Sequence, residues 1–120
     1  MNNKEKLNQK KHLVVIGGGA AGFFTAINAV HPNLSVTILE KSNKVLSKVK
    51  VSGGGRCNVT NALEPISAFA KLYPRGANFL KKSLHHFSNQ DTIKWFEDQN
   101  VHLKVEDDGR MFPVTDDSQT

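Results

Sequence analysis

The fold is decided by the stretch Leu13-Val14-Val15-Ile16-Gly17-Gly18-Gly19-Ala20-Ala21-Gly22, where an apolar run meets a run of small residues. The β-branched first half predicts a short strand that is covered on both faces. The glycines match the spacing Gly-x-Gly-x-x-Gly, which by itself is a weak signal. Its position between a predicted strand and a predicted helix strengthens it, because each glycine needs that context to act.

The residues that follow predict a helix and a second strand. Residues 23–30 are mostly small or apolar, and Pro32 favours the end of a helix just before it. The run Ser35-Val36-Thr37-Ile38-Leu39 then predicts a strand that ends at Glu40. The order strand, helix, strand predicts an α/β fold with parallel strands, the N-terminal part of a Rossmann-like FAD/NAD(P)-binding domain.

The spacing of the glycines indicates how a dinucleotide would bind. Gly17 allows a tight turn, Gly19 lets the backbone approach a pyrophosphate, and Gly22 lets the helix pack closely on the strand. Unpaired N–H groups at the helix N-terminus favour the anion. Glu40 is placed to accept hydrogen bonds from ribose hydroxyls, the alternative being a solvated glutamate beside Lys41. FAD and NAD present the same ADP half, so this unit does not choose between them.

A second glycine-rich loop follows: Ser52-Gly53-Gly54-Gly55-Arg56-Cys57-Asn58-Val59-Thr60-Asn61. Together with residues 15–22 and Lys48, it resembles the HI0933-like flavoproteins, also known as the aminoacetone oxidase family of FAD-binding, NAD(P)/FAD-dependent oxidoreductases. The run Asp107-Asp108-Gly109-Arg110-Met111-Phe112-Pro113 resembles that family as well, so the similarity extends from Leu13 to the end. The resemblance implies FAD as the cofactor and a flavin-dependent oxidoreductase as the full-length protein.

The same resemblance implies which residues bind FAD. The expected cofactor-binding residues are Gly17, Gly19, Ala21 and Gly22 at the pyrophosphate, with Gly18 and Ala20 in the same loop, Glu40 and Lys41 at the adenosine, and Lys48, Ser52, Gly53, Gly54, Gly55, Arg56, Cys57 and Asn58 near the flavin. The family's usual Gly-Arg before the lysine is Leu46-Ser47 here, a departure that weakens the case for a phosphate contact from that stretch. No catalytic residue is assigned.

Two residues of the second loop have alternative roles. Arg56 offers a planar, permanently charged donor to a flavin or phosphate, and it serves equally as a loop anchor through a salt bridge. A thiol beside this arginine, Cys57, is a candidate for a lowered pKa and redox chemistry. The missing C-x-x-C partner favours burial instead. No metal site is expected, because the adjacent His85 and His86 point in different directions on a helix.

The rest of the chain predicts helices and a small hairpin. Helices are expected over residues 65–69, 76–84 and 89–100, the last with Ile93, Trp95 and Phe96 packed inward. The alternation of Val101, Leu103 and Val105, followed by a turn at residues 107–109, predicts a β-hairpin. Residues 115–120 resemble the capped start of a helix, so we expect a C-terminally truncated fragment that is inactive alone.

Composition limits the remaining classes. The 120 residues have a net charge of +5 and one cysteine, with no signal peptide and no apolar run of the roughly eighteen residues that span a bilayer. We therefore expect a cytoplasmic protein with no membrane partner. Residues 1–11 are interpreted as a mobile basic tail containing Lys4, Lys6, Lys10 and Lys11, and residues 12–120 as the FAD-binding part.

Two other functions remain as alternatives. An NAD-binding dehydrogenase domain shares the first glycine motif but does not need the second loop. A non-enzymatic nucleotide- or RNA-associated module would use the basic tail and the excess charge. The leading hypothesis needs FAD, an unidentified small-molecule substrate and, as a candidate electron donor, NAD(P)H; nucleic acid is not an expected partner.

Overall fold

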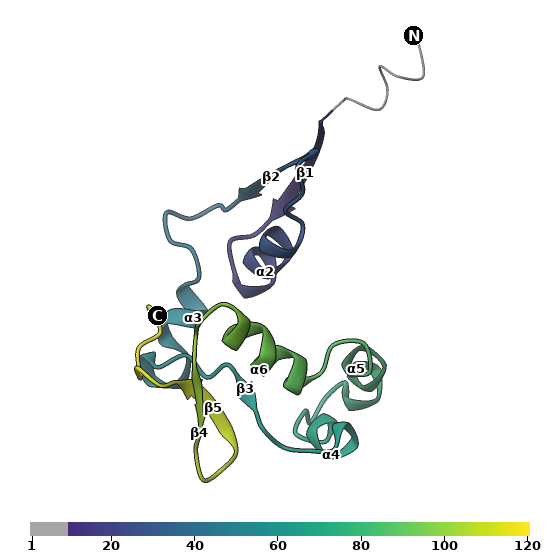
Figure 1. The fold of residues 1–120 in the computed structure, drawn as a ribbon, viewed down its shortest axis with the longest axis vertical. Coiled ribbons are helices and arrows are strands. Elements are labelled where there is room, and N and C mark those ends of the chain that lie inside the picture. The colour runs from purple at the N-terminus through teal and green to yellow at the C-terminus, as the bar shows by residue number, and fades with distance from the viewer. Residues whose placement is uncertain (1–9) are drawn as a thin grey trace. The chain divides into compact units, whose positions relative to one another are not determined.

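The computed structural model describes residues 10–120, and the chain divides into two compact units at Val49 and Lys50 (Figure 1). Most of the predicted basic tail, with Lys4 and Lys6, lies outside the described residues. Among residues 10–120, no helix combines the length and apolar character needed to cross a membrane.

The first unit is the predicted strand, helix, strand arrangement. It contains β1 (Lys11–Ile16), α2 (Ala20–Asn28) and β2 (Leu34–Leu39). The two strands pair in parallel, with the last residue of β1 opposite the last residue of β2. β1 begins ahead of the predicted Leu13, so Lys11 belongs to the strand, and its N–H donates to the carbonyl oxygen of Asn33 at 2.9 Å.

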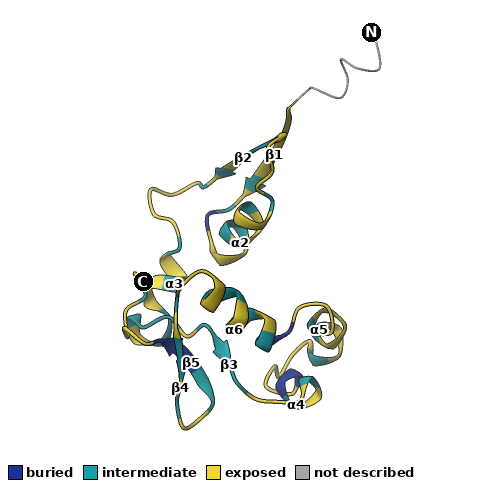
Figure 2. Ribbon diagram, in the orientation of Figure 1, coloured by how far each residue is buried: buried dark blue, intermediate teal, exposed yellow. Residues whose placement is uncertain are grey.

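One face of this two-stranded sheet packs against α2. An ideal Cβ at Gly22 of α2 would lie 3.5 Å from the Cγ1 atom of Val15, so Val15 faces the helix. Side chains alternate along a strand, and the neighbouring Val14 and Ile16 are 45% and 80% exposed (Figure 2). The prediction that this strand is covered on both faces is therefore wrong for the described residues.

The second unit combines helices with a small antiparallel sheet. Its elements are α3 (Ser47–Val51), which crosses the division, the 3-10 turn η1 (Ser52–Gly55), β3 (Thr60–Asn61), α4 (Ile66–Ala70), α5 (Ala77–Leu84), α6 (Asn89–Asp98), β4 (Leu103–Val105) and β5 (Arg110–Pro113). The strand order is β3-β5-β4. The predicted helices and hairpin are confirmed. β3 was predicted only as part of a turn, and residues 115–120 form turns rather than the start of a helix.

The start of α6 is tied to the connection between β3 and α4. Ser88 and Asp91 form a capping box, which pairs N–H groups that the first helical turn leaves free. The side-chain amide of Asn89, only 2% exposed, donates to the carbonyl oxygens of Asn61 at 2.8 Å and Leu63 at 3.0 Å. These polar contacts hold two segments distant in sequence together.

Candidate nucleotide-binding site

The first glycine loop requires glycine at two positions, Gly17 for its backbone conformation and Gly22 for lack of space. Gly17 has φ +104°, a conformation that side chains rarely adopt, and its N–H donates to the carbonyl oxygen of Leu39 at 2.7 Å. A Cβ on Gly22 would lie 2.0 Å from the carbonyl oxygen of Gly17. The tight turn and the close approach of helix to loop therefore require glycine, as the sequence predicts.

The N-terminus of α2 faces open space. Gly19 is the N-cap residue in extended conformation, it offers no capping side chain, and the first turn carries no acidic residue. No atom beyond its chain neighbours would lie within 4 Å of a Cβ placed on Gly19. The first N–H groups of a helix lack intrahelical partners and carry the positive end of its dipole. This opening has the chemistry and the space that an anionic group needs.

Glu40 directly follows β2, and its carboxylate is hydrogen-bonded to the first glycine loop. Its Oε2 atom accepts the N–H of Gly18 at 2.8 Å, and its Oε1 atom accepts the N–H of Ser42 at 2.9 Å. These hydrogen bonds, the one from Gly18 above all, lower the pKa of the Glu40 carboxyl below its ordinary value. Each carboxylate oxygen keeps a further lone pair, so Glu40 can still accept hydrogen bonds from hydroxyls. The N–H of Gly18, in contrast, already donates its hydrogen bond to Glu40.

The turn after Glu40 contains the departure from the family pattern. Leu46 has φ +53°, a left-handed conformation that favours glycine, the residue that the family resemblance implies at this position. The N–H of Leu46 donates to the carbonyl oxygen of Gly18 at 2.8 Å, which holds the turn against the glycine loop. The two lysines expected at the cofactor, Lys41 and Lys48, are exposed.

The second glycine loop is an irregular turn. Gly53, Gly54 and Gly55 all have positive φ angles, of +58°, +72° and +91°. A Cβ on Gly53 would lie 2.4 Å from the ring of Phe112, whereas a Cβ on Gly54 would meet nothing within 4 Å. Gly53 is therefore required for close packing against Phe112, whereas the backbone of Gly54 is accessible from outside the loop.

Arg56 anchors this loop. Its Nη1 atom lies 2.5 Å from Oε1 of Glu106 and 3.5 Å from Oδ1 of Asp116, and its Nε donates to the carbonyl oxygen of Gly53 at 3.3 Å. The hydrogen bond to Glu106 raises the pKa of the Arg56 guanidinium. Arg56 was predicted either to bind a flavin or phosphate or to anchor the loop through a salt bridge, and the structure shows the salt bridge. Sequence reasoning missed both acidic partners, because neither lies near Arg56 in the chain.

Cys57 does not have the electrostatics of a reactive thiol. Burial raises the pKa of its thiol above the ordinary value, and this effect outweighs the opposing hydrogen bond with Ser52. This agrees with burial, the role that the sequence favoured, and contradicts the alternative of a lowered thiol pKa, since the neighbouring guanidinium of Arg56 is directed to carboxylates instead. The next residue, Asn58, is exposed.

Comparisons with known proteins identify a family model and several relatives of this chain. A family model described as the HI0933-like protein Rossmann domain matches residues 11–120. The chain is 30% identical over 106 residues to a ribosomal RNA dihydrouridine synthase of Haemophilus influenzae, covering 88% of this chain and 26% of that protein. It is 31% identical over 99 residues to the protein of the same name in Escherichia coli, covering 82% and 24%.

A third relative carries a different name. The chain is 31% identical over 104 residues to a 3-dehydro-bile acid delta(4,6)-reductase of Clostridium scindens, covering 85% of this chain and 24% of that protein. The chain thus spans about a quarter of the length of each of these relatives.

Proposed function

The chain belongs to the HI0933-like family of Rossmann domains, and from this premise we propose that it is the FAD-binding region of a flavin-dependent oxidoreductase. The observation that carries the proposal is the open, uncapped N-terminus of α2 at Gly19. The pyrophosphate of FAD binds there, on the N–H groups of the first turn, and Ala20 and Ala21 expose no side chain large enough to obstruct it.

The adenosine half of the cofactor is bound next to this opening. Glu40 is ionised at neutral pH and oriented by Gly18 and Ser42, so its remaining lone pairs accept the ribose hydroxyls. A carboxylate at this point disfavours a 2′-phosphate on the ribose. Gly18 acts by holding Glu40, and Lys41 lies on the adenosine side.

We extend the proposal to Lys48 and to residues 52–58 as the flavin-proximal part, on the strength of the family resemblance. Gly54 and Asn58 are exposed, so their backbone can approach a ligand. Arg56 contributes by holding the shape of the loop through its carboxylate partners. Bound FAD supplies the electron transfer, and the chain supplies binding and orientation.

The named relatives indicate two substrate classes for the full-length protein, a ribosomal RNA and a 3-dehydro-bile acid. Both names are compatible with addition of hydrogen to an organic substrate, and NAD(P)H is the proposed source of electrons. The competing function, an NAD-binding dehydrogenase domain, uses the same first unit and differs in the cofactor that copurifies.

The first test is the absorbance spectrum of the purified full-length protein, before and after addition of FAD. Bound flavin gives absorbance bands at about 375 and 450 nm. Substituting Gly19→Asp then separates binding from folding, because aspartate is a better N-cap than glycine by a few tenths of a kcal/mol but places a negative charge where the pyrophosphate binds.

The matched control is Gly19→Asn, which has nearly the same size and caps the helix without charge. We expect both variants to fold, the asparagine variant to bind FAD more weakly than the wild type, and the aspartate variant to bind it least. A colourless wild type that ignores FAD and binds NADH would instead support the dehydrogenase domain.

A further inference from the structure

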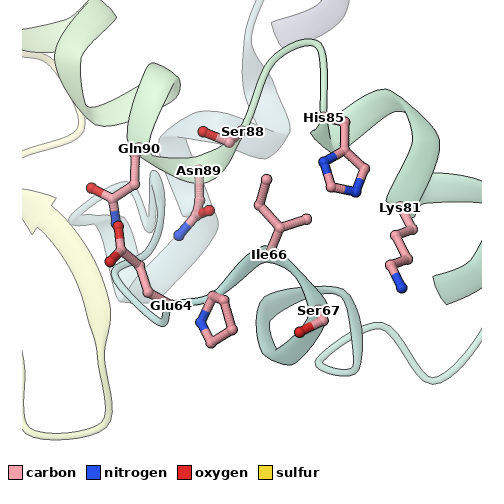
Figure 3. A pocket seen from close by; sticks show the side chains of 9 residues that line it. Glu64, Ile66, Ser67, Lys81, His85, Ser88, Asn89 and Gln90 are labelled. Carbon is pink, nitrogen blue, oxygen red and sulfur yellow. The ribbon is translucent and has the colours of Figure 1, made fainter.

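The second unit contains a cavity with opposite charges on its two sides. The cavity has a volume of about 630 Å³ and lies between the start of α4, the end of α5 and the start of α6. Figure 3 shows Lys81 and His85 of α5 on one side and Glu64 on the other. The apolar side chain of Ile66 lies between these two sides. Within residues 10–120 neither Glu64 nor Lys81 forms a salt bridge, so both charges are available to a ligand.

A buried amide supplies a free acceptor to the same cavity. Asn89, only 2% exposed, lines the cavity, and its Nδ2 atom donates to the carbonyl oxygens of Asn61 at 2.8 Å and Leu63 at 3.0 Å. These acceptors use both N–H groups of the amide and so fix its orientation. Among the residues that the structure describes, none donates to the Oδ1 atom of Asn89, which Figure 3 shows on the side of Ile66. A ligand N–H group that reaches this oxygen therefore gains a hydrogen bond.

The charges of the lining distinguish between classes of ligand. An anion is attracted by Lys81 but repelled by the Glu64 carboxylate and by the free acceptor of Asn89, and a simple amine meets the opposite conflict at Lys81. The positive end of the α6 dipole, which borders the cavity, is offset by the Asp91 carboxylate in the capping box. A ligand with both charges, separated by an apolar chain, matches all these groups. The volume is within the range of small-molecule sites.

We propose that this cavity binds a small zwitterion whose ammonium and carboxylate groups are separated by an apolar chain, the class of the ω-amino acids. The carboxylate accepts hydrogen bonds from Lys81 and His85. The ammonium group donates to Glu64 and to the Oδ1 atom of Asn89, and the chain packs on Ile66. The site lies within the second unit and uses none of the residues proposed for FAD, so it is independent of the proposed function.

The test is isothermal titration calorimetry of the full-length protein with two ω-amino acids, γ-aminobutyrate and ε-aminocaproate. Each is compared with two analogues of the same chain length that carry a single charge: butyrate and butylamine for the first, caproate and hexylamine for the second. The ligands are titrated to about 10 mM, because ligands this small make few contacts. We expect at least one ω-amino acid to bind, and both of its analogues to bind about tenfold more weakly, because each loses a charge-assisted contact. The inference is overturned if neither ω-amino acid binds or if an analogue binds as tightly.

Single-residue variants locate the binding. Glu64→Gln keeps the size of the side chain and should reduce the preference for the ω-amino acid over its carboxylate analogue about tenfold. Lys81→Gln should likewise reduce the preference over the amine analogue. The matched controls Lys82→Gln and Glu97→Gln remove the same charges from exposed positions on α5 and α6 outside the cavity lining, and they should bind as the wild type does. Equal effects of Lys81→Gln and Lys82→Gln would show a general effect of charge and overturn the inference.

The flavin spectrum of the same preparations keeps the two proposals apart. A colourless wild type that binds an ω-amino acid contradicts only the proposed function. A yellow wild type that binds neither ω-amino acid contradicts only the inference drawn from the cavity.

Discussion

Arg56 lies over the face of Phe112, with its guanidinium carbon 4.1 Å from the ring centroid, and so joins the second glycine loop to strand β5. Arg110 approaches the same ring at 5.4 Å. Both distances are within the range of cation–π attraction. Phe112 is fully buried, so one aromatic side chain supports the loop, the strand and two cations.

Truncating this ring should destabilise the protein severely. Phe112→Ala is expected to lower the free energy of unfolding by about 3–5 kcal/mol, because it removes buried apolar surface and leaves a cavity. Urea denaturation followed by circular dichroism measures the change. Val114→Ala, at a side chain 52% exposed, is the control and should change stability by less than about 0.5 kcal/mol. Similar losses in the two variants would show that Phe112 is not the support described here.

Gly53 and Gly54 form a pair that separates packing from backbone strain. Both residues have left-handed backbone conformations. Replacing either one by alanine should therefore lower the free energy of unfolding by about 1–2 kcal/mol through backbone strain. Only at Gly53 does the added Cβ collide with the ring of Phe112. We expect Gly53→Ala to be the more destabilising variant by about 1–3 kcal/mol. Equal unfolding midpoints for the two variants would contradict this contact.

Glu40 should make the stability of the protein depend on pH in the acid range. Its pKa is lowered in the folded state, from an ordinary value of 4.5, chiefly by the N–H of Gly18. The ionised carboxylate therefore stabilises the fold fully above about pH 4.5, and this contribution is lost as the pH falls through the lower, folded-state pKa. Thermal unfolding from neutral pH to about pH 3 measures it.

The comparison variant for that experiment is Glu40→Gln, which keeps the size of the side chain and cannot ionise. It should be less stable than the wild type at neutral pH, and the difference should shrink on acidification. A difference that stays constant with pH would mean that the charge of Glu40 contributes nothing through Gly18.

Cys57 should react slowly with alkylating reagents. Burial raises the pKa of its thiol above the ordinary value of 9.0, so the thiolate fraction at neutral pH is smaller than in an unfolded chain. Iodoacetamide labelling followed by mass spectrometry should be slower in the native than in the urea-unfolded protein and should accelerate at alkaline pH. Faster labelling of the native protein would restore Cys57 as a redox candidate.

The amino-acid sequence by itself determined the strand, helix and strand of the first unit and the glycine positions of its loop. These signals are local, because β-branched runs, helix ends and positive φ angles depend on neighbouring residues. For the same reason the helices α4, α5 and α6 and the hairpin of β4 and β5 were predictable. The family resemblance of the second loop was also readable from consecutive residues.

Only the tertiary structure decided which groups these elements bring together. The hydrogen bond between Gly18 and Glu40 joins residues that are 22 apart in sequence. The salt bridge between Arg56 and Glu106 joins residues that are 50 apart. No periodicity or spacing encodes such partners. The exposed face of β1 and the exposed ring of Phe79 have the same origin, because exposure depends on what else packs there. Local chemistry therefore specified the elements, and long-range packing assigned their roles.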